Sequence, residues 1–184
     1  VYKRQVIKES GSMSKNVLVV IDMQNDFIDG ALGTKEAPAI IENVYQVIQS
    51  FEGEVVFTRD THFKNYADTQ EGKKLPIPHC IKGTNGWQIN SKLKNLIKPE
   101  TKIFDKITFG STELTEYLKN NKELEKVTLA GLCTDICIIS NALLIKANLP
   151  EVEIEVLENC CAGVTPESHI NALNAMKMCQ ISVK

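Results

Sequence analysis

The chain has 184 residues, of which 43% are hydrophobic and 24% are charged, and its formal net charge is −2. These values are typical of globular proteins, so they exclude disorder or a collagen-like structure for the chain as a whole. The length fits one domain with a substantial buried core. Because no excess of positive charge offers a surface for nucleic acid or anionic membranes, we expect neither as a partner.

Residues 1–12 are polar and lack the apolar core of a signal peptide. No apolar run in the chain approaches the ~20 residues that a membrane span requires. Since Met13 follows this polar stretch, we predict a single domain over residues 13–184, preceded by a disordered or expression-derived leader. We expect a cytoplasmic protein.

The cysteines do not have the spacing of a zinc ribbon or of a thioredoxin-type site. The two close sets are a Cys-x-x-x-Cys and an adjacent pair, and the sequence carries no export signal. We therefore predict reduced thiols rather than disulfides. The six are Cys80, Cys133, Cys137, Cys160, Cys161 and Cys179.

Short apolar runs rich in β-branched residues alternate with helical patterns along the chain. This alternation predicts an α/β fold, a three-layer αβα sandwich around a mostly parallel, doubly wound sheet of about six strands. In chain order we predict a strand at 17–22, a helix at 37–51, strands at 54–59 and 101–105, a helix around 114–118, a strand at 127–130, a helix at 135–147, a strand at 152–157, a helix at 166–178 and a last strand from Ile181.

One segment, residues 63–88, breaks the alternation because it has prolines, glycines and mixed charge without a clear period. Long loops of this kind are usually functional or disordered. We interpret this one as a lid-like loop over the strand ends.

Chemically capable residues follow several predicted strands. In a doubly wound sheet the active site lies outside the carboxyl ends of the strands. Asp22, Asp60 with His62, Lys106 and the segment 133–137 all come directly after predicted strands. We therefore expect an acid, a pair of metal ligands, a lysine and a thiol at one edge of the sheet.

Cys137 is predicted in the first turn of a helix that begins near Thr134 or Asp135, either of which could cap it. Free N–H groups and the helix dipole favour a thiolate there and could hold an oxyanion. The alternative is that Cys137 is a small buried apolar residue. Likewise, Asp22 is either a proton acceptor for the thiol or a turn residue. Lys106 either stabilises a thiolate or is solvated.

Three further residues could hold a metal. Asp60 and His62 stand two residues apart, and His79 adds a second imidazole from the following loop. One carboxylate and two imidazoles suit Zn, Fe(II) or Mn(II), with positions left for water or substrate. The alternative is a turn-capping aspartate with two solvated histidines. The third histidine, His169, lies in a helical pattern and is expected to be structural or exposed.

Taken together, these motifs resemble the nicotinamidase/pyrazinamidase branch of the isochorismatase-like cysteine hydrolases. The resemblance extends from Met13 to the C-terminus. It is carried by five motifs that occur after successive strands: VIDMQNDF at 20–27, TRDTH at 58–62, PHCIKGT at 78–84, DK at 105–106 and GLCTDIC at 131–137.

The resemblance implies a catalytic triad of Asp22, Lys106 and Cys137. It also implies a non-proline cis peptide between Leu132 and Cys133, with the N–H groups of Cys133 and Cys137 around the oxyanion. By the same resemblance Asp60, His62 and His79 bind a divalent transition metal that orients the pyridine nitrogen of nicotinamide, and Phe27 packs against the ring.

The sequence departs from the branch at 75–78, where prolines and aliphatic residues replace an aromatic that usually precedes the last histidine. Phe109 is our candidate for the missing wall of the ring pocket. The expected activity is hydrolysis of nicotinamide to the carboxylic acid and ammonia through a thioester, as part of NAD metabolism. A homo-oligomer is one state that the resemblance allows.

Three alternatives stay open at this point. The substrate could be another small amide, ureide or N-carbamoyl compound, with a vestigial metal site. Isochorismate hydrolysis is less expected because it needs neither the metal ligands nor the cysteine. A catalytically dead binding domain is also possible, but the presence of all three of Asp22, Lys106 and Cys137 argues against it.

Overall fold

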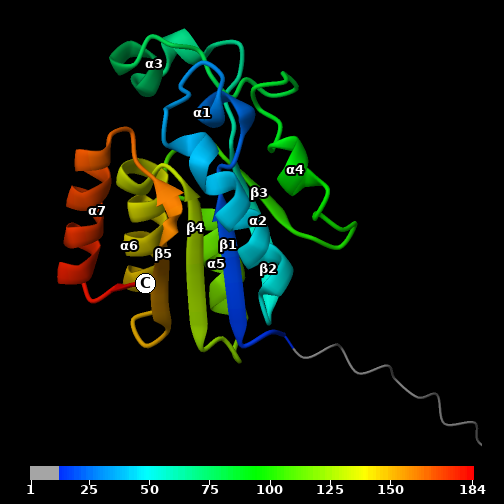
Figure 1. Ribbon diagram of the computed structural model, residues 1–184, viewed down its shortest axis with the longest axis vertical. Helices are drawn as coiled ribbons and strands as arrows, with labels where there is room; N and C mark the ends of the chain where they lie inside the picture. The colour runs from blue at the N-terminus through cyan, green and yellow to red at the C-terminus, as the bar shows by residue number, and fades with distance from the viewer. Residues whose placement is uncertain (1–12) are drawn as a thin grey trace, which may run out of the picture.

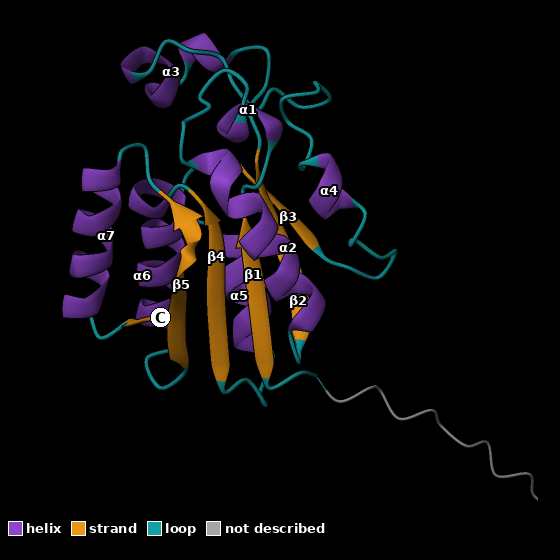
Figure 2. Ribbon diagram, in the orientation of Figure 1, coloured by secondary structure: helices purple, strands orange, loops and turns teal. Residues whose placement is uncertain are grey.

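The computed structural model describes residues 13–184, so the leader predicted for residues 1–12 lies outside the described residues. A central six-stranded sheet is covered by helices on both faces (Figures 1 and 2). This arrangement confirms the predicted α/β fold. The strands are β1 (Asn16–Ile21), β2 (Glu54–Asp60), β3 (Ile103–Lys106), β4 (Lys126–Leu132), β5 (Glu153–Ala162) and β6 (Ser182–Val183).

All neighbouring strands are parallel, in the order β3-β2-β1-β4-β5-β6. The chain builds one half of the sheet outward from β1 and then returns to build the other half from β4. Strand order therefore reverses between β1 and β4. In sheets of this type the crevice outside the carboxyl ends at the reversal point is where ligands bind.

The sequence of strand β1 is apolar throughout because both faces of the strand are buried. Its alternate side chains enter two different cores, so both faces of the strand are buried. Val17, Val19 and Ile21 join the core on one face, whereas Leu18 and Val20 join the core on the other face. A sheet of this kind is held by hydrophobic burial on both sides, which fixes the positions of the strand ends.

The two layers of helices contribute to these two cores. Helices α5, α6 and α7 cover one face, and α1, α2 and α4 cover the other (Figure 1). The helices and single turns are α1 (Asn25–Ile28), η1 (Ala37–Ile40), α2 (Ile41–Ser50), η2 (Tyr66–Asp68), α3 (Gln70–Lys74), α4 (Ser91–Lys94), α5 (Thr112–Asn120), η3 (Thr134–Ile138), α6 (Ile139–Asn148) and α7 (Pro166–Met178).

The predicted helix at 166–178 has the observed bounds of α7, because Thr165 and Ser168 form a capping box and Pro166 occupies the first turn. Strand β5 extends beyond the predicted 152–157, to Ala162. Its register against β4 shifts between Leu129 and Gly131, which displaces the carboxyl end of the strand.

The segment 63–88 lies over the carboxyl edge of the sheet (Figure 1). It contains two short elements that the sequence pattern did not reveal, η2 and α3. Thr69 caps α3 by accepting a hydrogen bond from the N–H of Gly72. The expectation of a loop without its own structure was therefore too simple.

Within residues 13–184, no helix has the length and apolar character needed to cross a membrane.

Candidate active site

Three chain segments bring an acid, an amine and a thiol together at the point where the strand order reverses. Asp22 follows β1, Lys106 ends β3, and Cys137 lies in the turn after β4. The Nζ of Lys106 lies 2.6 Å from Oδ2 of Asp22 and 3.4 Å from Sγ of Cys137. All three side chains are at most 5% exposed. The structure thus assembles the three residues of the predicted triad.

The backbone and side chain of Asp22 are both fixed by β2. The hydroxyl of Thr58 donates to Oδ1 of Asp22 at 2.6 Å, and the N–H of Asp22 is within hydrogen-bond distance of the Thr58 carbonyl. Asp22 has a φ of 49°, which is uncommon for a residue with a side chain. Such conformations are found disproportionately at active sites.

Burial and neighbouring charges determine the protonation of this group. Burial raises the pKa of Asp22, and the adjacent Lys106 only partly opposes this effect. Burial lowers the pKa of Lys106, but Asp22, Cys137 and Asp60 outweigh that effect and hold the pKa above its ordinary value. Lys106 is therefore a cation between acidic neighbours.

The Cys137 thiol differs from the expectation for a helix start. Burial and the nearby Asp22 raise its pKa well above the ordinary value, although Lys106 acts in the opposite direction. The resting residue is consequently a thiol, not the thiolate that its place in the chain suggested. A thiol in this environment requires a base to remove its proton, and Asp22 is positioned for that role.

The turn that carries Cys137 is a single π-type turn, η3, preceded by a cis peptide between Leu132 and Cys133. Before it, Gly131 has a φ of 127°, and a Cβ at this position would lie 2.0 Å from the Ile21 carbonyl oxygen. Only glycine allows β4 to pass β1 so closely.

The predicted capping of this turn by Thr134 or Asp135 was wrong, because Cys133 is the N-cap and makes no side-chain cap. Instead, the Thr134 hydroxyl is 2.7 Å from Nδ1 of His169, and the Asp135 carboxylate accepts from the N–H of Val164. These two side chains therefore form hydrogen bonds with α7 and with the segment before it instead of capping the turn.

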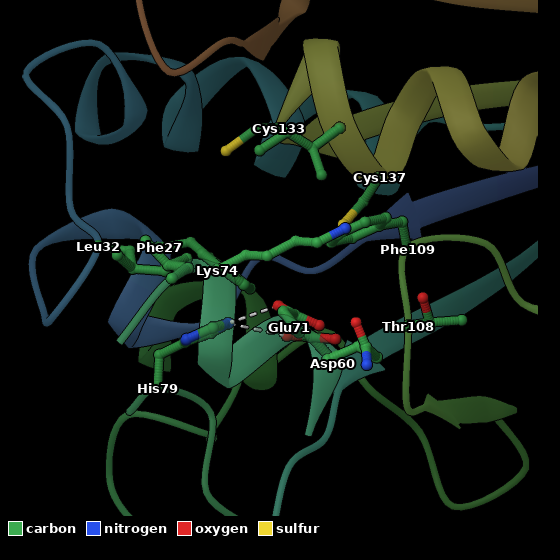
Figure 3. A pocket seen from close by; sticks show the side chains of 13 residues that line it. Phe27, Leu32, Asp60, Glu71, Lys74, His79, Thr108, Phe109, Cys133 and Cys137 are labelled. Atoms are coloured by element: carbon green, nitrogen blue, oxygen red, sulfur yellow. Dashed lines mark ion pairs between the residues drawn. The ribbon is translucent and has the colours of Figure 1, made fainter. Parts of the chain in front are cut away.

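A second group of side chains gathers next to the triad. One ligand atom from each of Asp60, His62, Glu71 and His79 lies within 4.8 Å of the other three. Nε2 of His79 is 3.4 Å from Oδ2 of Asp60 and 3.5 Å from Oε1 of Glu71 (Figure 3). Two imidazole nitrogens and two carboxylate oxygens form a donor set that suits a divalent transition metal.

The orientation of the two imidazoles fits this interpretation. Nδ1 of His79 lies 2.9 Å from the Ile77 carbonyl, an arrangement that leaves Nε2 free to bind a cation. Nε2 of His62 is buried and has no hydrogen-bond partner among the described residues, although Oδ2 of Asp60 is 2.9 Å away. The two Nε2 atoms therefore lie close enough to the carboxylate oxygens of Asp60 and Glu71 for all four residues to bind one cation.

The electrostatics of the group also favour a cation. Burial lowers the pKa of both histidines, but Asp60 and Glu71 outweigh it and raise the values to about 9 for His62 and about 10 for His79. Burial raises the pKa of Glu71, but the two histidines outweigh it and lower the value to about 2. The two carboxylates thus carry negative charge that a divalent ion would neutralise.

Glu71 is the residue that the sequence interpretation missed. It lies in α3, inside the segment that was expected to be irregular, and its neighbours form no motif with Asp60 or His79. Thr69 is a residue type that predicts a helix start and so could have indicated α3, but it does not indicate that Glu71 would reach Asp60 and His79.

Several other residues hold the ligands in place. The side chain of Gln24 accepts from the N–H of Asp60 at 2.7 Å and donates to the Asp60 carbonyl at 2.8 Å, so it joins the ends of β1 and β2. The carboxylate of Asp26 accepts from the N–H of Cys80 at 2.7 Å, next to His79. The ring of Tyr66 packs edge-on against both histidine ligands.

Members of both groups line one cavity of about 340 Å³ (Figure 3): Cys137 of the triad, and Asp60, Glu71 and His79 of the ligand group. Asp60, Glu71 and His79 lie on one side of it, and Cys133 and Cys137 on the other. Apolar side chains supply most of the remaining lining: Phe27, Leu32, Leu75, Phe109 and Ile136. The cavity is of the size that accommodates small molecules, with a few polar groups placed among apolar walls.

The two aromatic residues expected at the ring pocket both line this cavity. Phe27 is nearly buried, and its ring centroid is 5.6 Å from that of His79. Phe109 lies on the opposite side and is 43% exposed. The prolines and aliphatic residues at 75–78 add Leu75 to the lining in place of an aromatic wall.

The comparisons with known proteins agree with this geometry. The family model described as Isochorismatase domain matches residues 16–183. An uncharacterized isochorismatase family protein of Bacillus subtilis, PncA, is 31% identical over 87% of this chain and 93% of its own length. A nicotinamidase of Saccharomyces cerevisiae is 26% identical over 68% of this chain and 79% of its own length.

Solved structures give the same result. The pyrazinamidase of Pyrococcus horikoshii, in complex with zinc, superposes with a TM-score of 0.79 at 27% identity. The superposition covers 92% of this chain and 98% of that one. The similarity therefore extends through the whole sheet and the loops that carry the cavity.

Proposed function

Because the chain belongs to the isochorismatase family and is similar to its nicotinamidase branch, we propose that it is a metal-assisted cysteine amidase of nicotinamide and analogues such as pyrazinamide. The products are the carboxylic acid and ammonia. The observation that carries the proposal is a single cavity lined by Cys137 on one side and by Asp60, Glu71 and His79 on the other. Behind its wall, Lys106 lies within 3.4 Å of Cys137 and 2.6 Å of Asp22.

Acylation begins with proton transfer from the Cys137 thiol to Asp22. The raised pKa of Asp22 makes it a stronger base than an ordinary carboxylate, and Lys106 compensates the negative charge that develops on sulfur. The sulfur then attacks the carboxamide carbon, and the oxyanion is held by the N–H groups of Cys133 and Cys137. Asp22 returns the proton to the amide nitrogen, which leaves as ammonia.

Deacylation repeats the same roles with water. Asp22 takes a proton from water as its oxygen attacks the thioester carbon, and the carbon–sulfur bond breaks to release the acid. The proton then returns to sulfur, so the enzyme is restored with Cys137 as a thiol. One carboxylate thus serves both half-reactions as base and acid, a role that the raised pKa of Asp22 favours.

Asp60, His62, Glu71 and His79 would hold the divalent metal at the far side of the cavity from Cys137. When bound, the metal supplies a Lewis-acid site that orients the ring nitrogen of the substrate. Phe27 and Phe109 flank the ring, and their apolar surfaces bind it by hydrophobic contact.

The test of the substrate is ammonia release from a panel of small amides. We expect nicotinamide and pyrazinamide to be hydrolysed with a higher kcat/KM than benzamide, which has the ring but no ring nitrogen. Turnover of a ureide or N-carbamoyl compound with no turnover of nicotinamide would assign the chain to the alternative amidase reaction.

Removal of the metal is predicted to act mainly on substrate binding. The purified protein should hold about one divalent transition-metal ion per chain, and a chelator should raise the KM for nicotinamide much more than that for benzamide. His79→Ala and Glu71→Gln should each weaken metal binding at least about tenfold, as measured by elemental analysis and metal titration.

His169→Gln is the matched control for this experiment, because it changes the one histidine outside the ligand group. It should retain the metal. Full nicotinamidase activity in excess chelator, with no metal detected, would remove the metal from the proposal and favour a metal-independent amidase.

A further inference from the structure

Asn141, one turn after Cys137, has a fully buried polar side chain that the proposed chemistry does not use. Its Nδ2 donates to the Cys137 carbonyl at 2.7 Å and to the Phe109 carbonyl at 3.0 Å. Its Oδ1 accepts from the N–H of Ser111 at 2.9 Å. Both amide protons and the amide oxygen therefore form hydrogen bonds, and every partner is a backbone group.

These bonds join two segments that both line the cavity. The first is the turn that carries the nucleophile, and the second is the loop 107–111 that carries Phe109. The loop lies directly on α6, since a Cβ at Gly110 would be 3.3 Å from the Leu144 side chain. Ser111 then caps α5, which fixes the far end of the loop.

Phe109 is 43% exposed, so packing of its own side chain does little to fix its position. An exposed aromatic ring on a loop can define the shape of a cavity only if hydrogen bonds or packing fix the backbone of that loop. Asn141 is the side chain that holds this backbone, and the same amide group also holds the carbonyl of Cys137.

We propose that Asn141 is a positioning residue that sets the distance between Phe109 and the nucleophile, and so makes the cavity selective for planar aromatic amides. This inference rests on the proposed function for the identity of the substrate. The coupling between the two segments is a statement about geometry and can be tested without turnover.

The first test is alkylation of Cys137 by iodoacetamide and by its N-phenyl derivative, in a Cys179→Ser background that removes the exposed thiol. We expect the unmodified cavity to favour the aromatic reagent. Asn141→Ala should lower this preference about tenfold, the size of effect that follows from leaving buried backbone groups unpaired. Asn141→Asp keeps the shape and the acceptor but loses both donors, and should have the same effect if the alanine variant folds poorly.

Asn148→Ala is the control, because its Nδ2 donates to the Leu144 carbonyl on the same helix at an exposed position. It should leave the preference unchanged. In a Phe109→Ala background, Asn141→Ala should have no further effect on the preference for the aromatic reagent, because the ring that Asn141 positions is absent. Independent, additive effects of the two substitutions would overturn the proposal, as would an unmodified cavity without aromatic preference.

Steady-state kinetics complete the test. Asn141→Ala should raise the KM for nicotinamide about tenfold and change kcat much less, whereas a general loss of structure would lower the active fraction and leave KM unchanged. If the unmodified protein does not hydrolyse nicotinamide but the alkylation preference falls as expected, the proposed substrate fails and the positioning role of Asn141 stands.

Discussion

Replacement of Cys137 by alanine is expected to reduce ammonia release from nicotinamide by at least about a thousandfold. In the proposed mechanism the sulfur of Cys137 is the nucleophile that forms the thioester. Cys133 also lines the cavity, but burial raises the pKa of its thiol to about 12, and its sulfur has no hydrogen bond to a basic group within residues 13–184. The measurement is kcat/KM for the variant with its metal content confirmed.

The matched control is Cys179→Ser, at the exposed cysteine among the six free cysteines. It should retain nearly full activity. Cys80, Cys160 and Cys161 are buried and have no role in the proposed chemistry, so they should tolerate alanine with most activity retained, although some stability is lost. If Cys137→Ala keeps more than a few per cent of the rate, covalent catalysis at this residue is wrong.

The second large effect is expected for Lys106→Met, which preserves the length of the side chain and removes its charge. Lys106 is 4% exposed and lies within 3.5 Å of Asp22, Cys137 and Asp60. Without the cation, the buried Asp22 carboxylate loses its partner, so we expect the free energy of unfolding to fall by about 3 kcal/mol and kcat to fall by about a hundredfold or more.

Removal of the positive charge of Lys106 should make the Cys137 thiol less reactive. Lys106 favours the thiolate, so its removal raises the pKa of Cys137 still further and slows alkylation at neutral pH. The check is the pH profile of iodoacetamide alkylation in the Cys179→Ser background, whose midpoint should move to higher pH.

Lys126→Met is the matched control for this variant, because Lys126 is a half-buried lysine paired with Glu155 near the start of β4. Its loss should leave the alkylation profile unchanged. An unchanged profile for Lys106→Met as well would show that Lys106 has no influence on the thiol.

A large part of this site could be predicted from residue type and order. Asp22, Asp60 and Lys106 each stand at the end of an apolar run, and parallel strands bring their carboxyl ends to one edge of a sheet. Once the alternation of strands and helices predicts a parallel sheet, the proximity of these residues follows from topology. That is why the expected triad is assembled in the structure.

Two features depended on contacts between segments distant in the chain. Glu71 joins the ligand group only because the segment that contains α3 folds over the carboxyl edge of the sheet, and Asn141 contacts the Phe109 loop only because α6 packs beside it. Neither residue stands in a motif with its partners. Sequence spacing reports local structure, but it carries no information on which distant segments will meet.

The sequence by itself determined the α/β class, the positions of most strands and helices along the chain and the edge at which the chemistry lies, because these follow from hydrophobic period and the rules of parallel sheets. Only the tertiary structure decided the charge states. The thiol of Cys137 has a raised pKa although it stands near a helix start and a lysine, since burial and Asp22 outweigh both. Burial depends on the packing of the whole molecule, and the penalty it places on a charged group can exceed the effect of any single neighbour.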